Sequence, residues 1–137
     1  MNPIEVVLPG EIEKRSFEII SEELEKRQIV LPKEQEPVTK RVIHTSADFD
    51  YAETMCYSDH AVEIAKELIL KGADIVTDTN MALAGINKKI LASFGGEAHC
   101  FMADLDVAQL ARERQVTRAT ISMEKPQPLK NRLFLRS

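Results

Sequence analysis

The sequence has 137 residues, of which 44% are hydrophobic and 29% charged, as in a single globular domain that buries a core. Its net charge of −4 and pI near 5.4 argue against nucleic-acid binding, which normally requires a basic surface. No apolar run approaches the roughly 18 residues that cross a bilayer, and the N-terminus lacks the features of a signal peptide. Two distant cysteines, Cys56 and Cys100, fit no CxxC pattern. We therefore expect free thiols, a cytoplasmic protein and no association with a membrane.

Two helices are predicted in the first third of the chain. Residues 11–28 form an amphipathic pattern in which apolar side chains recur near the helical period, at Ile12, Phe17, Ile20 and Leu24. Residues 38–49 are ambiguous, because their β-branched side chains suit a strand. A helix is nevertheless favoured there, since Pro37 suits a first helical position and one face would carry Val38, Val42 and Ile43.

Further along the chain, helices alternate with short apolar strands. Ser58 is expected to cap a helix that ends at Lys71-Gly72 and has Ala61, Ile64, Ala65 and Leu68 on its inner face. Strands are predicted at 73–78 and 97–102, and helices at 81–96 with a break at Gly85, at 104–115 and at 117–125. Residues 4–8 are a possible third strand, and residues 129–137 resemble the beginning of another. This alternation predicts an α/β fold with a parallel sheet, in which ligands bind where the strands end, near Asp78 and Met102.

The stretch RVIHTSADFD, residues 41–50, contains the first candidate for chemistry, His44. An imidazole titrates near neutral pH, so His44 can serve as a general acid or base, with Thr45, Ser46, Asp48 and Asp50 as orienting or binding groups. Judged from its neighbours alone, however, a lone histidine beside apolar residues is more often a structural residue of the core than a catalytic one. His60 and His99 have no metal-ligand spacing between them or with His44, so no metal site is expected.

Two further segments suit anion binding. TDTNMALAG, residues 77–85, passes from a strand into a helix, a turn that presents backbone N–H groups, yet it contains neither GxGxxG nor a P-loop. Asp78 at that strand end also resembles the phosphoacceptor of a small receiver-like domain. Arg118 follows the capping Thr117, where a cation opposes the helix dipole, so either an external anion or solvent is its partner.

Taken in order, four segments resemble the precorrin-8X methylmutase (precorrin isomerase) family of cobalamin biosynthesis. They are EIEKRSFEII, RVIHTSADFDYA, GADIVTDTNMALAGINKKIL and QVTRAT, and the resemblance extends over residues 10–124 of a single domain spanning 1–137. It implies a three-layer α/β/α fold with a mainly parallel sheet and a homodimer. The implied reaction is migration of a methyl group between adjacent carbons of one ring of a corrinoid, either metal-free precorrin-8X or its cobalt form, without a cofactor.

The resemblance also assigns roles to individual residues. His44 stands where the family has its catalytic histidine, which acts as a general acid. The implied substrate-binding residues are Ser16, Thr45, Asp78, Met81 and Arg118. Positive potential for a substrate with many carboxylates would come from Arg15, Lys40, Arg41 and Arg118.

The family continues beyond this sequence with another strand, GNAP-type and PVGFV-type segments and a Gly-rich stretch. These are lacking here, so the sequence is interpreted as a C-terminally shortened member. The alternative is a shortened, non-catalytic relative that binds a corrinoid or assembles with a partner.

Overall fold

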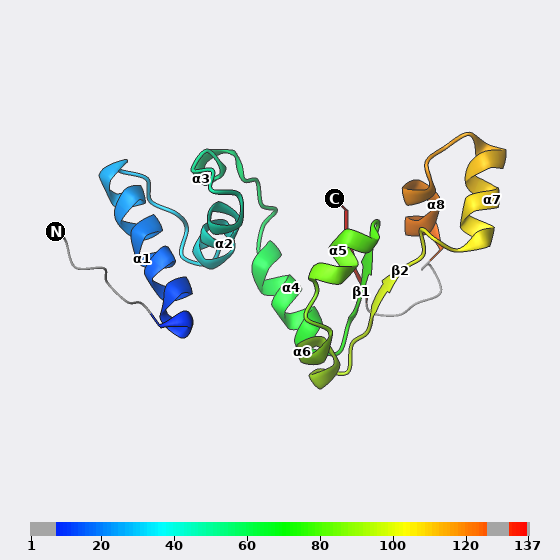
Figure 1. Ribbon diagram of the computed structural model, residues 1–137, viewed down its shortest axis with the longest axis horizontal. Coiled ribbons are helices and arrows are strands. Elements are labelled where there is room, and N and C mark those ends of the chain that lie inside the picture. The colour runs from blue at the N-terminus through cyan, green and yellow to red at the C-terminus, as the bar shows by residue number, and fades with distance from the viewer. Residues whose placement is uncertain (1–7, 126–131, 137) are drawn as a thin grey trace. The chain divides into compact units, whose positions relative to one another are not determined.

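A computed structural model describes residues 8–125 and 132–136. The chain divides into two compact units, Met1–Val62 and Glu63–Ser137, and each is described by itself (Figure 1). The described part of the chain contains no helix that is both long and apolar enough to cross a bilayer.

The first unit is helical. It contains α1 (Pro9–Lys26), α2 (Glu36–Ser46) and α3 (Tyr51–Thr54), and α2 packs against both of the others (Figure 1). The core of this unit is a cluster of buried side chains from α1 and α2, namely Ile20, Leu24 and Ile43, surrounded by Ile29, Leu31, Phe49 and Ala52. The first predicted helix is therefore confirmed, except that Ile12 is 54% exposed and does not belong to the core.

The ambiguous segment 38–49 forms a helix, as predicted, with Pro37 in its first turn. Its buried face consists of Thr39 and Ile43, whereas Val38 is exposed, so the predicted apolar face was only partly right. Thr39 can be buried because its hydroxyl hydrogen-bonds to the Tyr57 hydroxyl at 2.8 Å.

The helix after Ser58 begins later than predicted. α4 (Ala61–Leu70) starts where the Ala61 N–H donates to the Ser58 carbonyl at 3.1 Å. It ends as expected, because Gly72 has φ +83°, a left-handed conformation that glycine adopts without strain. Ile64 is 51% exposed, so its assignment to the inner face was wrong.

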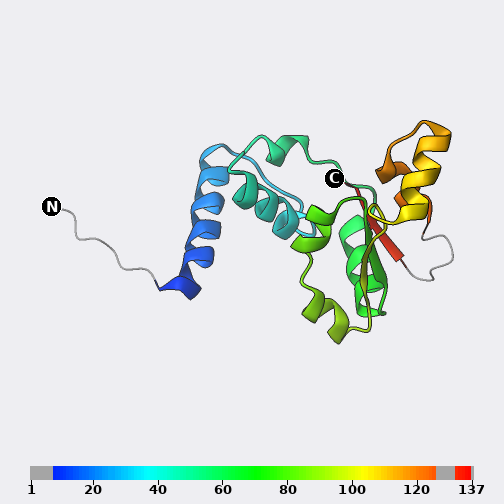
Figure 2. The same cartoon turned by 45° about the vertical axis from the view of Figure 1, so that its right-hand side comes forward.

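The second unit contains a three-stranded sheet with strand order β2-β1-β3, and all of its strands are parallel. Its last strand in the sequence is the red arrow in Figure 2. The strands are β1 (Asp74–Thr77), β2 (Ala98–Cys100) and β3 (Arg132–Leu135). In register, Val76 of β1 lies opposite His99 on one side and Phe134 on the other. The α/β class, the parallel sheet and both internal strands are thus confirmed, and the third strand comes from the predicted segment 129–137. The possible strand at 4–8 falls almost wholly outside the described residues.

Besides α4, the described part of this unit contains α5 (Asn80–Gly85), α6 (Lys88–Ser93), α7 (Leu105–Arg114) and α8 (Arg118–Glu124). The predicted break at Gly85 is confirmed, since it separates α5 from α6. α7 and α8 pack on each other through Val107, Ala111 and Ile121, and Phe101 and Leu110 extend this cluster.

Thr117 caps α8, as predicted, because its hydroxyl oxygen accepts the Thr120 N–H at 3.3 Å. We expect Thr117→Ala to reduce the free energy of unfolding by about 1 kcal/mol, since one N–H of the first turn loses its partner. Thr54→Ala is the matched control, because the exposed Thr54 hydroxyl donates to its own helix's Asp50 carbonyl and caps nothing. Urea unfolding followed by circular dichroism measures both, and equal losses would contradict the capping role.

Candidate functional site

His44 lies in the last turn of α2, in the first unit, and its side chain is exposed. The imidazole packs against the Phe17 ring of α1, with ring centroids 5.3 Å apart and planes inclined by 33°. A core histidine would be enclosed by apolar side chains and bonded to a buried partner. His44 is therefore not a buried core histidine, and its imidazole is accessible to a ligand.

A cation shares the same aromatic ring. The Arg41 guanidinium lies 4.8 Å from the Phe17 ring centroid and forms an ion pair with Glu13. Arg41 and His44 are three residues apart on α2, and Glu13 and Phe17 are four apart on α1, so each pair occupies one helix face. The two helices thus bring a carboxylate, a guanidinium, an aromatic ring and an imidazole into one row.

Ser16 and Thr45 flank this row in the sequence. Their hydroxyls donate to the carbonyls of Ile12 and Arg41 respectively, each at 2.9 Å. Each hydroxyl still has lone pairs with which it can accept a hydrogen bond from a ligand. The structure thus places Ser16, His44 and Thr45 on neighbouring turns of α1 and α2.

A shallow hollow of about 530 Å³ lies beside the row, between α1 and α2. It is lined by Glu13, Lys14, Phe17, Glu18, Ser21 and Arg41. Lys40 adds a further cation at this pair of helices, where it donates to the Ser21 hydroxyl at 2.9 Å and pairs with Glu36. The surface therefore offers both cations and an aromatic face to a ligand.

The other three predicted residues belong to the second unit. Asp78 follows β1, is only 3% exposed, and donates its backbone N–H to the Leu135 carbonyl at 3.2 Å. Met81 in α5 is 86% exposed, and Thr79 between them caps α5 by accepting the Ala82 N–H at 3.2 Å. Arg118 is exposed at the first position of α8.

A second hollow, of about 450 Å³, lies along α7 and α8. Its ionisable lining residues are Asp106, Glu113, Glu124 and Lys125. Lys125 donates to Asp104 at 2.5 Å and to Asp106 at 3.1 Å, and these hydrogen bonds raise the pKa of Lys125 and lower the pKa of Asp106. Because three carboxylates and only one lysine line this hollow, its lining is net negative and does not suit an anionic ligand.

The remaining histidines have different surroundings. His99 Nε2 lies 3.1 Å from Asp74 Oδ2, and the ring stacks on Phe101 with centroids 5.7 Å apart. Because the other Asp74 oxygen accepts the Glu97 N–H at 2.9 Å, this pair ties β2 to the start of β1. His99 thus has a structural role between β2 and β1.

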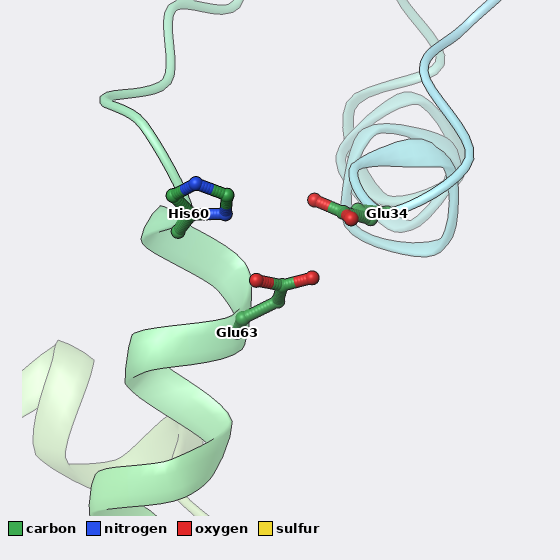
Figure 3. A group of neighbouring side chains, drawn as sticks. All are labelled: Glu34, His60 and Glu63. Carbon is green, nitrogen blue, oxygen red and sulfur yellow. The ribbon is translucent and has the colours of Figure 1, made fainter.

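Figure 3 shows the exposed side chains of Glu34, His60 and Glu63. His60 directly precedes α4, and Glu63 lies in the first turn of that helix, so the chain itself keeps these two close. Glu34 belongs to the first unit and Glu63 to the second, and the three groups therefore do not constitute a defined metal site.

Phe17 is the functional candidate that the sequence interpretation missed, since it was assigned only to the core face. The available signal was spacing: Glu13 and Phe17 stand one turn apart, as do Arg41 and His44. The sequence does not show that the α1 face with Glu13 and Phe17 contacts the α2 face with Arg41 and His44.

Comparison with known proteins identifies relatives along most of the chain. The precorrin-8X methylmutase family profile matches residues 11–135. The cobalt-precorrin-8 methylmutase of Salmonella typhimurium is 38% identical over 133 residues, which cover 93% of this chain and 63% of that protein. That of Priestia megaterium is 39% identical over 119 residues, covering 87% of this chain and 52% of that protein.

The fold agrees with these matches. The crystal structure of precorrin-8X methylmutase from Thermus thermophilus superposes with a TM-score of 0.76 at 30% identity, over 92% of this chain and 61% of that one. The chain thus spans between half and two thirds of the length of these relatives. The family match includes the α1–α2 row, the strands and the capped helices described above, and the chain belongs to the precorrin-8X methylmutase family.

Proposed function

We propose that this chain catalyses the methyl migration of a methylmutase in cobalamin biosynthesis, with His44 as the general acid. The observation that carries the proposal is the exposed imidazole of His44, held against an aromatic ring within the segment that matches the family. Because the match spans residues 11–135, we propose that residues 1–137 act as one precorrin isomerase-like domain.

The reaction requires little from the protein beyond proton transfer and orientation. One C–CH₃ bond breaks and another forms at the adjacent ring carbon, and the proton given by His44 is balanced by one that the macrocycle loses, so the formula is unchanged. Protonation of the conjugated system makes the shift easier, and general acids of this kind contribute about 10²–10⁴-fold in rate. Holding the ring in the reactive geometry supplies a further part of the barrier reduction.

The substrate class follows from the names of the relatives and from the charges near His44. The Salmonella and Priestia relatives are cobalt-precorrin-8 methylmutases, and the Thermus relative is a precorrin-8X methylmutase. A corrinoid with several carboxylates suits a surface that presents Arg15, Lys40 and Arg41. We propose Ser16 and Thr45 of the first unit, and Asp78, Met81 and Arg118 of the second, as substrate-binding residues, as the family resemblance implies. A cytoplasmic homodimer belongs to the same proposal.

A second candidate is a relative that binds a corrinoid without converting it. The limited coverage of the relatives motivates it, since they carry additional sequence that this chain does not match. In this case the row at His44 would bind the macrocycle and no methyl shift would follow.

An absorbance experiment separates the two candidates. The purified chain is mixed with precorrin-8X and, separately, with its cobalt form, and spectra are recorded over time while binding is followed by calorimetry. Enzymatic function predicts a change from the substrate spectrum to that of the isomer in which the methyl group has migrated. Binding without a spectral change would support the second candidate, and absence of both would contradict the two proposals together.

A further inference from the structure

The Phe17 ring is shared by two functional groups of α2. The His44 imidazole lies 5.3 Å from it and the Arg41 guanidinium 4.8 Å, both measured to the ring centroid. These three residues and Glu13 lie in the first unit and on two helices whose contact is fixed by the buried cluster of Ile20, Leu24 and Ile43. The ring is thus attached to the core of the unit and not to a loop.

Such a contact limits where the imidazole can point. An exposed histidine at the end of a helix would otherwise exchange among rotamers on a timescale of picoseconds to nanoseconds. An aromatic ring inclined by 33° offers its face to part of the imidazole and excludes the rotamers that would collide with it. A general acid needs this restriction, because its donor atom must meet one carbon of the macrocycle.

The same ring organises the charges beside His44. Arg41 is held by the face of Phe17 and by the carboxylate of Glu13, which offsets its charge. Arg41 therefore stays near the His44 imidazole. Because the Glu13 carboxylate offsets the guanidinium charge, Arg41 opposes protonation of His44 less than an unpaired arginine would. A carboxylate of the ligand can then approach Arg41 in competition with Glu13.

We propose that Phe17 is a positioning residue that sets the orientation of His44 and of Arg41 for the reaction. This inference rests on the proposed function of His44 as general acid. Phe17 itself donates no proton and forms no bond in the reaction. Its contribution is the rigid aromatic surface that the two side chains of α2 share.

The test compares three variants on α1. Phe17→Leu keeps an apolar side chain but removes the ring, and Phe17→Tyr keeps the ring. Ile20→Val is the matched control, because Ile20 is buried on the same helix, 6% exposed, and its truncation weakens packing without removing the aromatic surface. For each variant, kcat and KM of the methyl migration are measured together with Tm, and ¹³C relaxation of the His44 Cδ2–Hδ2 group reports imidazole mobility.

In Phe17→Leu we expect kcat to fall about 10- to 100-fold, as for misplacement of a catalytic group, and the imidazole to become mobile. KM should change by no more than about threefold, because most of the binding surface remains. Phe17→Tyr should restore both kcat and imidazole order, and Ile20→Val should lower Tm while leaving both unchanged.

Each outcome decides a different point. Parental kcat together with a rigid imidazole in Phe17→Leu would overturn the inference, as would an equal loss of kcat in Ile20→Val. If the parent chain converts no corrinoid, the proposed function fails, whereas relaxation still shows whether Phe17 holds His44. A rigid imidazole in Phe17→Leu would then overturn the positioning role as well.

Discussion

Replacement of His44 by alanine is expected to lower the rate of corrinoid conversion by about 10²–10⁴-fold while corrinoid binding remains largely intact. Among Glu13, Phe17, Arg41 and His44, only His44 carries an imidazole, the side chain that most often transfers protons in catalysis. Binding should persist because the cations and hydroxyls around His44 remain. The measurement is kcat from product absorbance, with Kd from calorimetry on the same preparation.

His60→Asn is the control for this experiment. His60 is an exposed histidine with φ +56°, a backbone conformation that asparagine tolerates, and it lies outside the α1–α2 row. We expect its rate and affinity to match those of the parent. Conversion by His44→Ala at the parental rate would remove the assignment of His44, and loss of binding with the rate would make His44 a substrate contact instead of an acid.

The sequence predicted this histidine but not its surroundings, for a physical reason. Periodicity indicates which face of a helix is apolar, and it correctly identified Ile20 and Leu24 as core residues. Periodicity does not give the rotation of α1 and α2 about their own axes where they pack, and that rotation determines whether Phe17 contacts His44. Ile12 and Ile64 show the same limit, since each lies on a predicted apolar face and is more than half exposed.

For the sheet, the two internal strands could be predicted from local sequence, whereas the order of the strands could not. The segments 73–78 and 97–102 were recognisable because short apolar runs lie between glycine and helix signals. The order β2-β1-β3 was not, because β1 pairs with a strand more than fifty residues later in the chain. Two strands rarely suffice for a stable sheet, so residues 132–135 supply what the internal strands lack.

The second large effect is expected at Gly96, which is buried between α6 and β2. A Cβ at this position would lie 2.4 Å from the Ala73 carbonyl oxygen and 3.0 Å from Leu91 Cδ1. Ala73 is fully buried and precedes the central strand, so its backbone can move only if β1 moves with it. We therefore expect Gly96→Ala to reduce the free energy of unfolding by about 1–3 kcal/mol or more.

Gly85→Ala makes the same chemical change where no atom interferes, since nothing lies within 4 Å of the place that its Cβ would occupy at the end of α5. An alanine in a helix is more favourable than glycine by about 0.5–1 kcal/mol, so this variant should be as stable as the parent or slightly more stable.

Both tyrosines, Tyr51 and Tyr57, lie in the first unit, so tyrosine fluorescence would not report on either glycine substitution directly. Amide hydrogen exchange at Val76, in the central strand, measures the second unit itself. Equal protection of Val76 in the two variants would show that the chain at Gly96 accommodates a methyl group, and the close approach to Ala73 would then not determine the stability of the sheet.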